Sequence, residues 1–333
     1  MTRARVALPG AGPGPMRAAG LSDAPLPPLD LSMPPWPGTT VTVRGTRVFL
    51  RRTPYTGPAR AAERALYLHG LGGASTNWTD LAGLLAHRLA GAALDLPGFG
   101  RSGPAPGRDY SVRGHARVVI RLLERTAGPV HLLGNSLGGA IAVVVAAVRP
   151  DLVRTLTLVS PAMPDLRLRR GSDPSMPLLL VPGLDRVVRW RLARLPPEAR
   201  ARALVELCFA DPSRVPPHRM AEAADEVRQR AELPWATDAL GRSLRGLVAT
   251  YLVPPSRSVW RLAGGIRAPT LVVWGDRDRL VDPALAPRTA AAIRDARLLL
   301  LPGVGHTAQL EDPVTVAKAV LALIDRLPAG HQQ

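Results

Sequence analysis

The residues best suited to chemistry lie in the run HLLGNSLGGAIAVVVAAV (131–148), where Ser136 stands between Gly134 and Gly138. A serine hydroxyl is a weak nucleophile unless a neighbouring base removes its proton during attack. In a G-x-S-x-G sequence the small neighbours let a strand turn sharply into a helix, with the hydroxyl projecting from the turn. Apolar residues flank this motif on both sides, so we predict a nucleophile here. The alternative is an ordinary tight turn with a capping serine.

A base and an acid for the serine are expected later in the chain, in the order serine, acid, histidine. The run LVVWGDRDRLVDP has a strand pattern that ends in a loop of carboxylates. The run LLLLPGVGHTAQLEDP then places His306 directly after the next predicted strand. A neutral imidazole can accept the serine proton and return it to a leaving group. Only His306, among seven histidines, lies at the end of a late strand in a glycine-bounded loop, so we predict that it is the base.

Backbone amides for a developing negative charge are predicted from HGLGG (69–73), which closes the strand-like run ALYLH. Such a loop can direct N–H groups into a site, and the first amides of a helix are also free. We therefore expect the amides of Leu71 and Leu137 to form an oxyanion hole, with Gly72 as a less favoured alternative to Leu71. An ordinary glycine turn is the competing interpretation, and His69 is expected to be structural.

The elements that must position these residues alternate between strand and helix patterns. Apolar strands that alternate with helices predict a mostly parallel sheet covered on both faces. A hairpin of TVTVRG and RVFLRR comes first. Later strands are predicted at 65–69, 91–96, 130–135, 156–160, 270–275 and 298–303, with helices near 75–89, 111–126, 137–148, 283–294 and 313–327.

Two stretches depart from this pattern. Residues 1–38 are rich in proline, glycine and alanine and are expected to form a disordered or loosely draped extension. Residues 164–265 contain helix-like periodicity interrupted by proline pairs and no convincing strand. We predict a helical insertion there, with 39–163 and 266–330 as the core. The apolar run 178–181 within the insertion indicates a hydrophobic acyl or ring substrate.

The chain resembles the α/β-hydrolase fold enzymes that carry a helical lid. The resemblance covers about residues 39 to 330, and its motifs follow the order and spacing of that family. It implies an α/β-hydrolase fold, a lid formed by the insertion between late strands, and an acyl-enzyme mechanism. The matching motifs are HGLGG (69–73), DLPGFGRS (95–102), GNSLGG (134–139), WGDRD (274–278) and GVGH (303–306).

The acid of the catalytic triad follows from this resemblance. In the family it is the last carboxylate of the G-x-x-D loop, which favours Asp278 over Asp276. Asp282 and Asp165 are weaker candidates. The resemblance therefore implies a triad of Ser136, Asp278 and His306.

The reaction class also follows from the resemblance. Relatives that dehalogenate alkanes or open epoxides use an aspartate nucleophile, so Ser136 implies hydrolysis of a carboxylic ester, thioester or lactone of a hydrophobic small molecule. A carbon–carbon bond hydrolase of ring-cleavage products is the alternative, because GNSLGG and Asn77 are similar to that branch. Thr307 stands where that branch commonly has an aromatic residue, which counts against this alternative.

The composition and the motifs argue against several other classes of function. A net charge of +17 comes with arginines scattered along the whole chain and with no nucleic-acid-binding motif, so we expect no nucleic-acid partner. The single cysteine, Cys208, excludes an internal disulfide framework. We expect no metal and no cofactor, because no metal-ligand spacing or phosphate-binding loop is present.

The sequence also bears on association with membranes. No apolar run approaches the roughly 20 residues that span a bilayer, and the first residues make a poor secretory signal, so a cytoplasmic location is expected. Arg189, Arg191 and Arg194 lie in an arginine-rich part of the insertion that could make weak contact with an anionic membrane surface. A peripheral membrane protein or a non-catalytic binding module on the same scaffold are therefore the alternatives from other classes.

Overall fold

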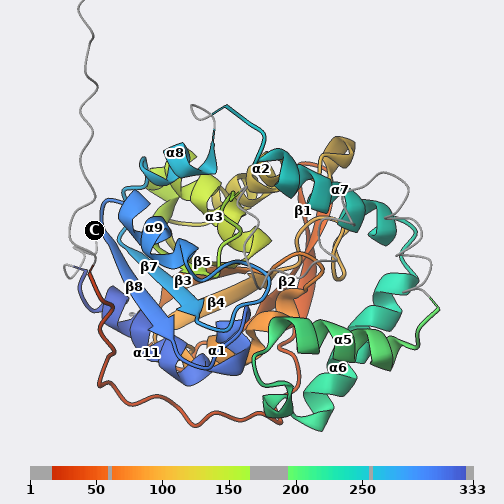
Figure 1. Cartoon of the computed structure of the whole chain (residues 1–333), viewed down its shortest axis with the longest axis horizontal. Coiled ribbons are helices and arrows are strands. Elements are labelled where there is room, and N and C mark those ends of the chain that lie inside the picture. Colours follow the sequence, from red (N-terminus) through yellow and green to blue (C-terminus); the bar gives the residue numbers. More distant parts are fainter. Residues whose placement is uncertain (1–16, 59–61, 166–193, 255–257, 328–333) are drawn as a thin grey trace, which may run out of the picture.

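The computed structural model describes residues 17–58, 62–165, 194–254 and 258–327. Its centre is one eight-stranded sheet with the order β1-β2-β4-β3-β5-β6-β7-β8 (Figure 1). Strands β1 and β2 pair antiparallel and β2 pairs antiparallel with β4, whereas all later neighbours are parallel. The strands are β1 (Gly38–Val43), β2 (Thr46–Arg52), β3 (Glu63–Leu68), β4 (Leu89–Leu94), β5 (Val130–Asn135), β6 (Val153–Val159), β7 (Thr270–Gly275) and β8 (Ala296–Leu301).

Helices cover both faces of the sheet, as Figure 1 shows, and each face has its own apolar core. The parallel strands β5 and β7 are buried along their whole length, which explains why most of their residues are apolar. One face is covered by α2 (Val112–Leu123), α3 (Leu137–Val148), α8 (Val259–Ala263) and α9 (Leu285–Ala292), and the other by α1 (Thr79–Leu84), α10 (Ala308–Glu311) and α11 (Pro313–Ile324).

The helices α2 and α3 differ in sequence because they differ in exposure. In α3 every residue from Leu137 to Ala146 is buried, so the helix is apolar all round. In α2 only one side faces the core, and the exposed side carries Arg113 and Arg117. The Ser111 hydroxyl accepts a hydrogen bond from the Gly114 N–H at the start of α2, which satisfies one otherwise free amide.

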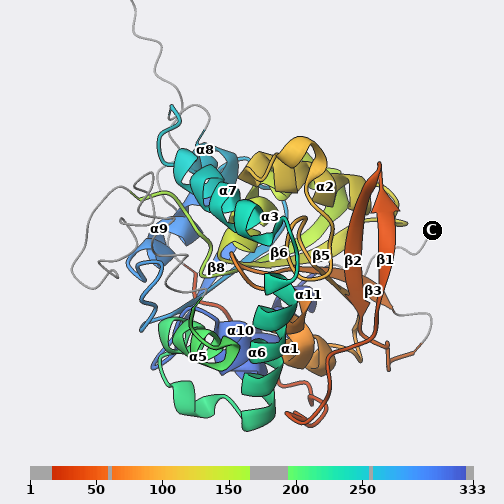
Figure 2. The same ribbon diagram turned by 90° about the vertical axis from the view of Figure 1, so that its right-hand side faces the viewer.

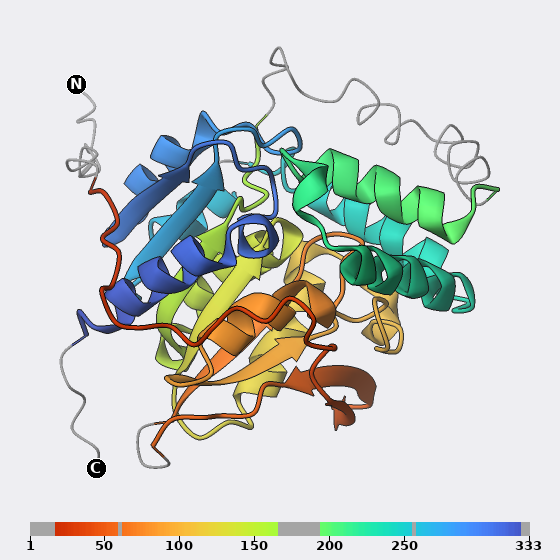
Figure 3. The ribbon, with the colours of Figure 1, turned by 90° about the horizontal axis from the view of Figure 1, so that it is seen from below.

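Residues 17–37 follow an extended path along the molecule, visible in Figure 3 as the dark red segment that passes α11 and reaches α1. Ala18 forms a parallel bridge with Leu298 of β8, and the Ser22 N–H donates to the carbonyl of Lys318 in α11. The indole N–H of Trp36 donates to the carbonyl of Thr79. These bonds hold residues 17–37 along the surface of the core, as in the draped alternative of the prediction; residues 1–16 lie outside the described residues.

Between β6 and β7 the chain forms helices and no strand within the described residues 194–254 and 258–265. Its three longer helices are α5 (Pro197–Cys208), α6 (Pro217–Ala231) and α7 (Ala236–Ala249). Pro197 and Pro217 are the first residues of α5 and α6, a position where the missing proline N–H costs no hydrogen bond. Figure 2 shows α5 and α6 beside α1 and α10, with α7 beside α2. None of the helices in the described ranges has the length and apolar character needed to cross a bilayer.

Candidate active site

Ser136 lies at the sharp turn between β5 and α3. Its backbone has φ 53° and ψ −116°, a region that non-glycine residues rarely occupy. A Cβ atom added to Gly134 would lie 2.4 Å from the carbonyl oxygen of Gly138, and one added to Gly138 would lie 2.3 Å from the carbonyl oxygen of Leu68. The turn therefore requires both glycines, because Gly134 packs on the backbone of residue 138, and Gly138 packs on the backbone at the end of β3.

Asn135, directly before Ser136, connects the serine turn to the histidine loop, which is the segment 302–307 that carries His306. Its side-chain amide donates to the carbonyls of Val159 and His306, each at 3.1 Å. The N–H of Ser136 also donates to the carbonyl of Val159, at 3.0 Å. These bonds fix the serine turn against both neighbouring segments. Sequence analysis did not assign this role, although a polar residue at the end of a wholly buried apolar strand is a usable signal.

His306 and Asp278 meet at the carboxyl ends of β8 and β7. The Nδ1 atom of His306 lies 2.8 Å from Oδ2 of Asp278, and the Asp278 side chain is fully buried. The other carboxylate oxygen accepts hydrogen bonds from the N–H groups of Leu280 and Val281, each at 2.9 Å. An ionised carboxylate only accepts, so Nδ1 carries the proton and Nε2 is left as the acceptor.

The other carboxylates considered from the sequence occupy different positions. Oδ1 of Asp276 accepts a hydrogen bond from the N–H of Gly303 at 2.7 Å, and its side chain is 38% exposed. Oδ1 of Asp282 accepts from the N–H of Ala284 at 2.8 Å. Asp165 follows β6 instead of β7. The structure thus brings Asp278 onto the imidazole.

The glycine loop after β3 packs directly against Ser136. A Cβ atom added to Gly70 would lie 3.2 Å from the Cβ atom of Ser136. The N–H of Gly73 donates to the carbonyl of Gly70 at 3.1 Å, which closes a tight turn around Leu71. Within the described ranges, the backbone N–H groups of Leu71 and Leu137 donate to no backbone or side-chain acceptor of the protein. Two free amides beside the serine can stabilise an oxyanion.

His69 has a structural role in the same loop. Its Nδ1 atom lies 2.7 Å from the carbonyl oxygen of Gly70, and its Nε2 atom accepts a hydrogen bond from the N–H of Leu96 at 3.0 Å. Burial lowers the pKa of His69, which keeps the imidazole neutral. Both ring nitrogens are used, so His69 holds the loop and is not available as a base.

The insertion also contacts the glycine loop. The guanidinium of Arg230 in α6 donates to the carbonyl of Gly72, and the hydroxyl of Thr76 donates to the carboxylate of Glu226 in the same helix. Burial lowers the pKa of Arg230 and raises the pKa of Glu226, and the opposite charge of each partly offsets this effect. These contacts were not predicted, because they join residues about 150 positions apart in the sequence.

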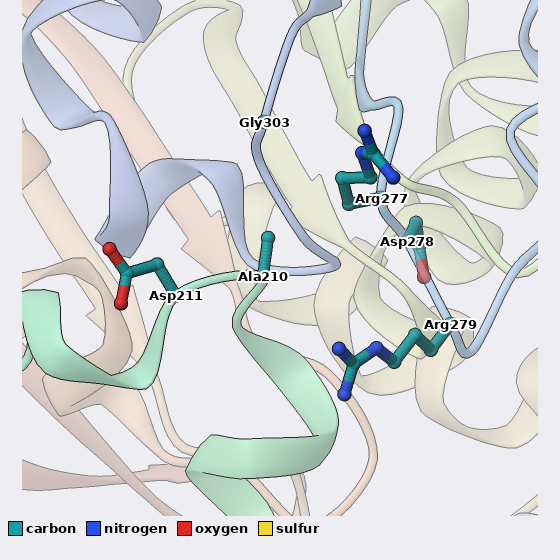
Figure 4. A pocket seen from close by; sticks show the side chains of 6 residues that line it. All are labelled: Ala210, Asp211, Arg277, Asp278, Arg279 and Gly303. Atoms are coloured by element: carbon teal, nitrogen blue, oxygen red, sulfur yellow. The ribbon is translucent and has the colours of Figure 1, made fainter.

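A pocket of about 440 Å³ opens between the end of α5 and the loop after β7 (Figure 4). The side chains of Arg277 and Arg279 extend on either side of Asp278, opposite the chain segment of Ala210 and Asp211. Ser136 and His306 are not among the described residues that line it. The lining residues are Ala210, Asp211, Arg277, Asp278, Arg279 and Gly303.

Several sequence-based predictions fall on parts of the chain that lie outside the described residues. These are the apolar run 178–181 and the arginines at 189 and 191. Arg194 is described, but the contact with an anionic membrane surface stays a prediction. In the described part of the chain, no group of three or more histidine, cysteine, aspartate or glutamate side chains is arranged to hold a metal ion.

A model of the family described as "alpha/beta hydrolase fold" matches residues 66–313. The chain belongs to this family. This α/β-hydrolase is 31% identical over 278 residues to "Putative carbamate hydrolase RutD" of Variovorax paradoxus (strain S110), covering 82% of this chain and 95% of that protein. It is 27% identical over 270 residues to "Monoacylglycerol lipase ABHD6" of Homo sapiens, covering 80% of this chain and 75% of that protein.

Solved structures agree with this assignment at the level of the fold. The structure of 2-hydroxy-6-oxo-6-phenylhexa-2,4-dienoate hydrolase (BphD) from Rhodococcus sp. strain RHA1 superposes with a TM-score of 0.69 at 20% identity, covering 86% of this α/β-hydrolase and 98% of that chain. The predicted family and fold class are therefore confirmed.

Proposed function

We propose that this α/β-hydrolase is a serine hydrolase that cleaves an ester-type bond of a hydrophobic small molecule through an acyl-enzyme. The observation that supports this most is the hydrogen bond from Nδ1 of His306 to the buried carboxylate of Asp278, in a loop joined to the Ser136 turn by Asn135. It leaves Nε2 of the imidazole free to accept a proton.

In the first half of the proposed reaction, the Ser136 hydroxyl attacks the acyl carbon and transfers its proton to Nε2 of His306. Asp278 keeps the imidazole in the required tautomer and stabilises the imidazolium. The N–H groups of Leu71 and Leu137 donate hydrogen bonds to the oxyanion of the tetrahedral intermediate and stabilise its charge. The imidazolium then protonates the leaving oxygen as its bond to the acyl carbon breaks.

In the second half, His306 removes a proton from a water molecule, whose oxygen attacks the acyl carbon of the acyl-enzyme. The bond between the Ser136 oxygen and the acyl carbon breaks, and the serine recovers its proton from the imidazolium. The insertion carries the substrate-selecting surface in this proposal, because its helix α6 contacts the loop of Leu71.

Two features favour cleavage at an acyl carbon bonded to a heteroatom over carbon–carbon cleavage. The relatives' names refer to a carbamate and to a monoacylglycerol, which both contain such an acyl carbon. Thr307 follows His306 at the position where the carbon–carbon hydrolases commonly have an aromatic residue, which also counts against that alternative.

The test is covalent labelling followed by turnover. A fluorophosphonate probe is expected to label Ser136 of the wild-type protein, and Ser136→Ala is expected to lose both labelling and hydrolysis of p-nitrophenyl esters by at least about 10⁴-fold in kcat. Ser160→Ala is a matched control, because Ser160 also has positive φ, 42°, at the end of the next strand, and its side chain is buried.

The outcomes separate the classes of function. Labelling of a serine other than Ser136 would contradict the proposed mechanism. Retained ligand binding without labelling or turnover would indicate a binding module. A panel of esters graded by acyl length, run beside one ring-cleavage product, distinguishes the two hydrolase classes, since turnover of the latter alone would favour carbon–carbon cleavage.

A further inference from the structure

Glu311 connects the histidine loop to the helical insertion. It lies five residues after His306, and its side chain is completely buried. One carboxylate oxygen accepts hydrogen bonds from the N–H groups of Gly305 at 2.7 Å and Ala210 at 3.1 Å. The other accepts from the N–H of Asp211 at 3.0 Å. One carboxylate thus holds backbone groups from two segments about 100 residues apart.

The two segments also bond to each other directly. The N–H of His306 donates to the carbonyl of Cys208 at 2.7 Å. A Cβ atom added to Gly305 would lie 2.5 Å from the carbonyl oxygen of Cys208 and 2.6 Å from the nitrogen of Ala210. No side chain fits between the two backbones. Figure 2 shows α5 beside α10.

The charge of Glu311 is matched to these donors. A buried carboxylate is unfavourable unless hydrogen bonds or opposite charge compensate it. Three N–H groups point at its oxygens, and a guanidinium nitrogen of Arg214 lies 3.8 Å from one of them. A neutral amide at this position would have only one accepting atom, so at least one of the three N–H groups would face another donor.

We propose that Glu311 is a positioning residue for His306, and that it joins the histidine loop and residues 208–211 into one unit. This inference rests on the proposed function. Asp278 orients the imidazole ring, whereas Glu311 fixes the backbone that carries the ring. Because a displacement of about 1 Å of a catalytic group can cost on the order of 100-fold in rate, loss of this carboxylate impairs catalysis without removing a reacting atom.

The experiment compares three variants of the full-length protein. Glu311→Gln keeps the shape of the side chain and removes its charge, and Glu311→Asp keeps the charge on a shorter side chain. Asp312→Asn is the matched control, because it makes the same carboxylate-to-amide change one residue further on. The Asp312 side chain accepts a hydrogen bond from the N–H of Thr315 at the start of α11, and asparagine can do the same.

Rates are measured on a short p-nitrophenyl ester and expressed per active serine, counted by titration with the fluorophosphonate probe. We expect Glu311→Gln to lower kcat by about 10- to 100-fold with KM within about threefold of wild type. Glu311→Asp is expected to recover most of this loss, and Asp312→Asn to stay within about twofold in kcat. A purely structural role lowers the number of active serines and leaves kcat per serine unchanged.

Three results would overturn the inference. One is a kcat of Glu311→Gln, per active serine, within twofold of wild type. Another is a loss confined to KM. The third is an equal loss in Asp312→Asn. If the wild-type protein is not labelled at Ser136, the proposed function fails and this inference fails with it; normal wild-type labelling with an unaffected Glu311→Gln contradicts only the positioning role.

Discussion

The serine turn and the seam between the insertion and the core are built in opposite ways. The turn at 134–148 contains no charged or titratable side chain and depends on backbone atoms in direct contact. The seam depends on charged and polar side chains that bond to backbone groups across it, as Arg230 bonds to Gly72 and Glu311 to Ala210. The turn leaves no room for a Cβ atom at Gly134 or Gly138, whereas the seam is held by hydrogen bonds of its side chains.

The difference indicates which changes each region tolerates. Where two backbones are in direct contact, even one added atom must displace a neighbour, so no substitution there has a small effect. A hydrogen bond between a side chain and a backbone group can be weakened in steps by changing charge or length. We therefore expect abrupt losses from substitutions at the turn and graded losses from substitutions in the seam.

The largest effect is expected from Gly138→Ala at the turn. The new Cβ atom would lie 2.3 Å from the carbonyl oxygen of Leu68 and 2.6 Å from that of His69. The backbone must move to accommodate it, so the free energy of unfolding should fall by about 3 kcal/mol or more. Urea denaturation measures the change. Gly264→Ala is the control, because its Cβ would have only ordinary contacts, the nearest at 3.5 Å, and should shift stability by less than about 1 kcal/mol.

An intermediate effect is expected from pH acting on His115, which lies in the seam where α2 meets α7. Its Nε2 atom lies 3.1 Å from the hydroxyl of Ser243, and burial lowers the pKa of His115 to about 3. Between the unfolded value, about 6.5, and about 3, the unfolded chain binds a proton that the folded chain does not. Stability is therefore complete above about pH 6.5 and falls on acidification, by up to about 1.4 kcal/mol per pH unit.

His115→Gln tests this pH dependence by urea denaturation at pH 7 and pH 5. The wild-type protein should lose about 2 kcal/mol more than the variant between the two values. Ser243→Ala is the control, since it removes the hydrogen bond but leaves the imidazole buried and should retain the wild-type slope. If the free energy of unfolding of His115→Gln falls between pH 7 and pH 5 by as much as that of the wild type, then His115 does not contribute to the loss of stability in acid.

The smallest effect is expected from Arg230→Met. The carbonyl of Gly72 loses its donor, so kcat/KM should fall by about tenfold, which corresponds to about 1.4 kcal/mol. Arg230→Met also leaves the buried carboxylate of Glu226 without its cationic partner, which lowers the free energy of unfolding. Adding Glu226→Gln should restore this free energy but should not restore kcat/KM. Arg228→Met is the control, since its side chain is 45% exposed and pairs with carboxylates at the surface. Equal effects of Arg228→Met and Arg230→Met would remove the distinction drawn for the seam.

The fold and the serine turn were predictable because their signals are local. Alternation of apolar strands and helices predicted the parallel sheet, and G-x-S-x-G between an apolar strand and helix predicted the turn with Ser136. The extension was harder to predict. Its proline-rich composition indicates little regular structure, and residues 17–37 form almost none, yet hydrogen bonds to β8, α11 and α1 hold them on the core.

The sequence by itself determined the order of strands and helices and the backbone conformation at Ser136, since both depend on residues close together in the chain. The tertiary structure decided which carboxylate reaches His306 and what holds the histidine loop in place. Those choices depend on the distance between segments such as 208–211 and 305–311, and on burial, which makes an unpaired charge unfavourable. Neither quantity is defined until the sheet has brought the segments together.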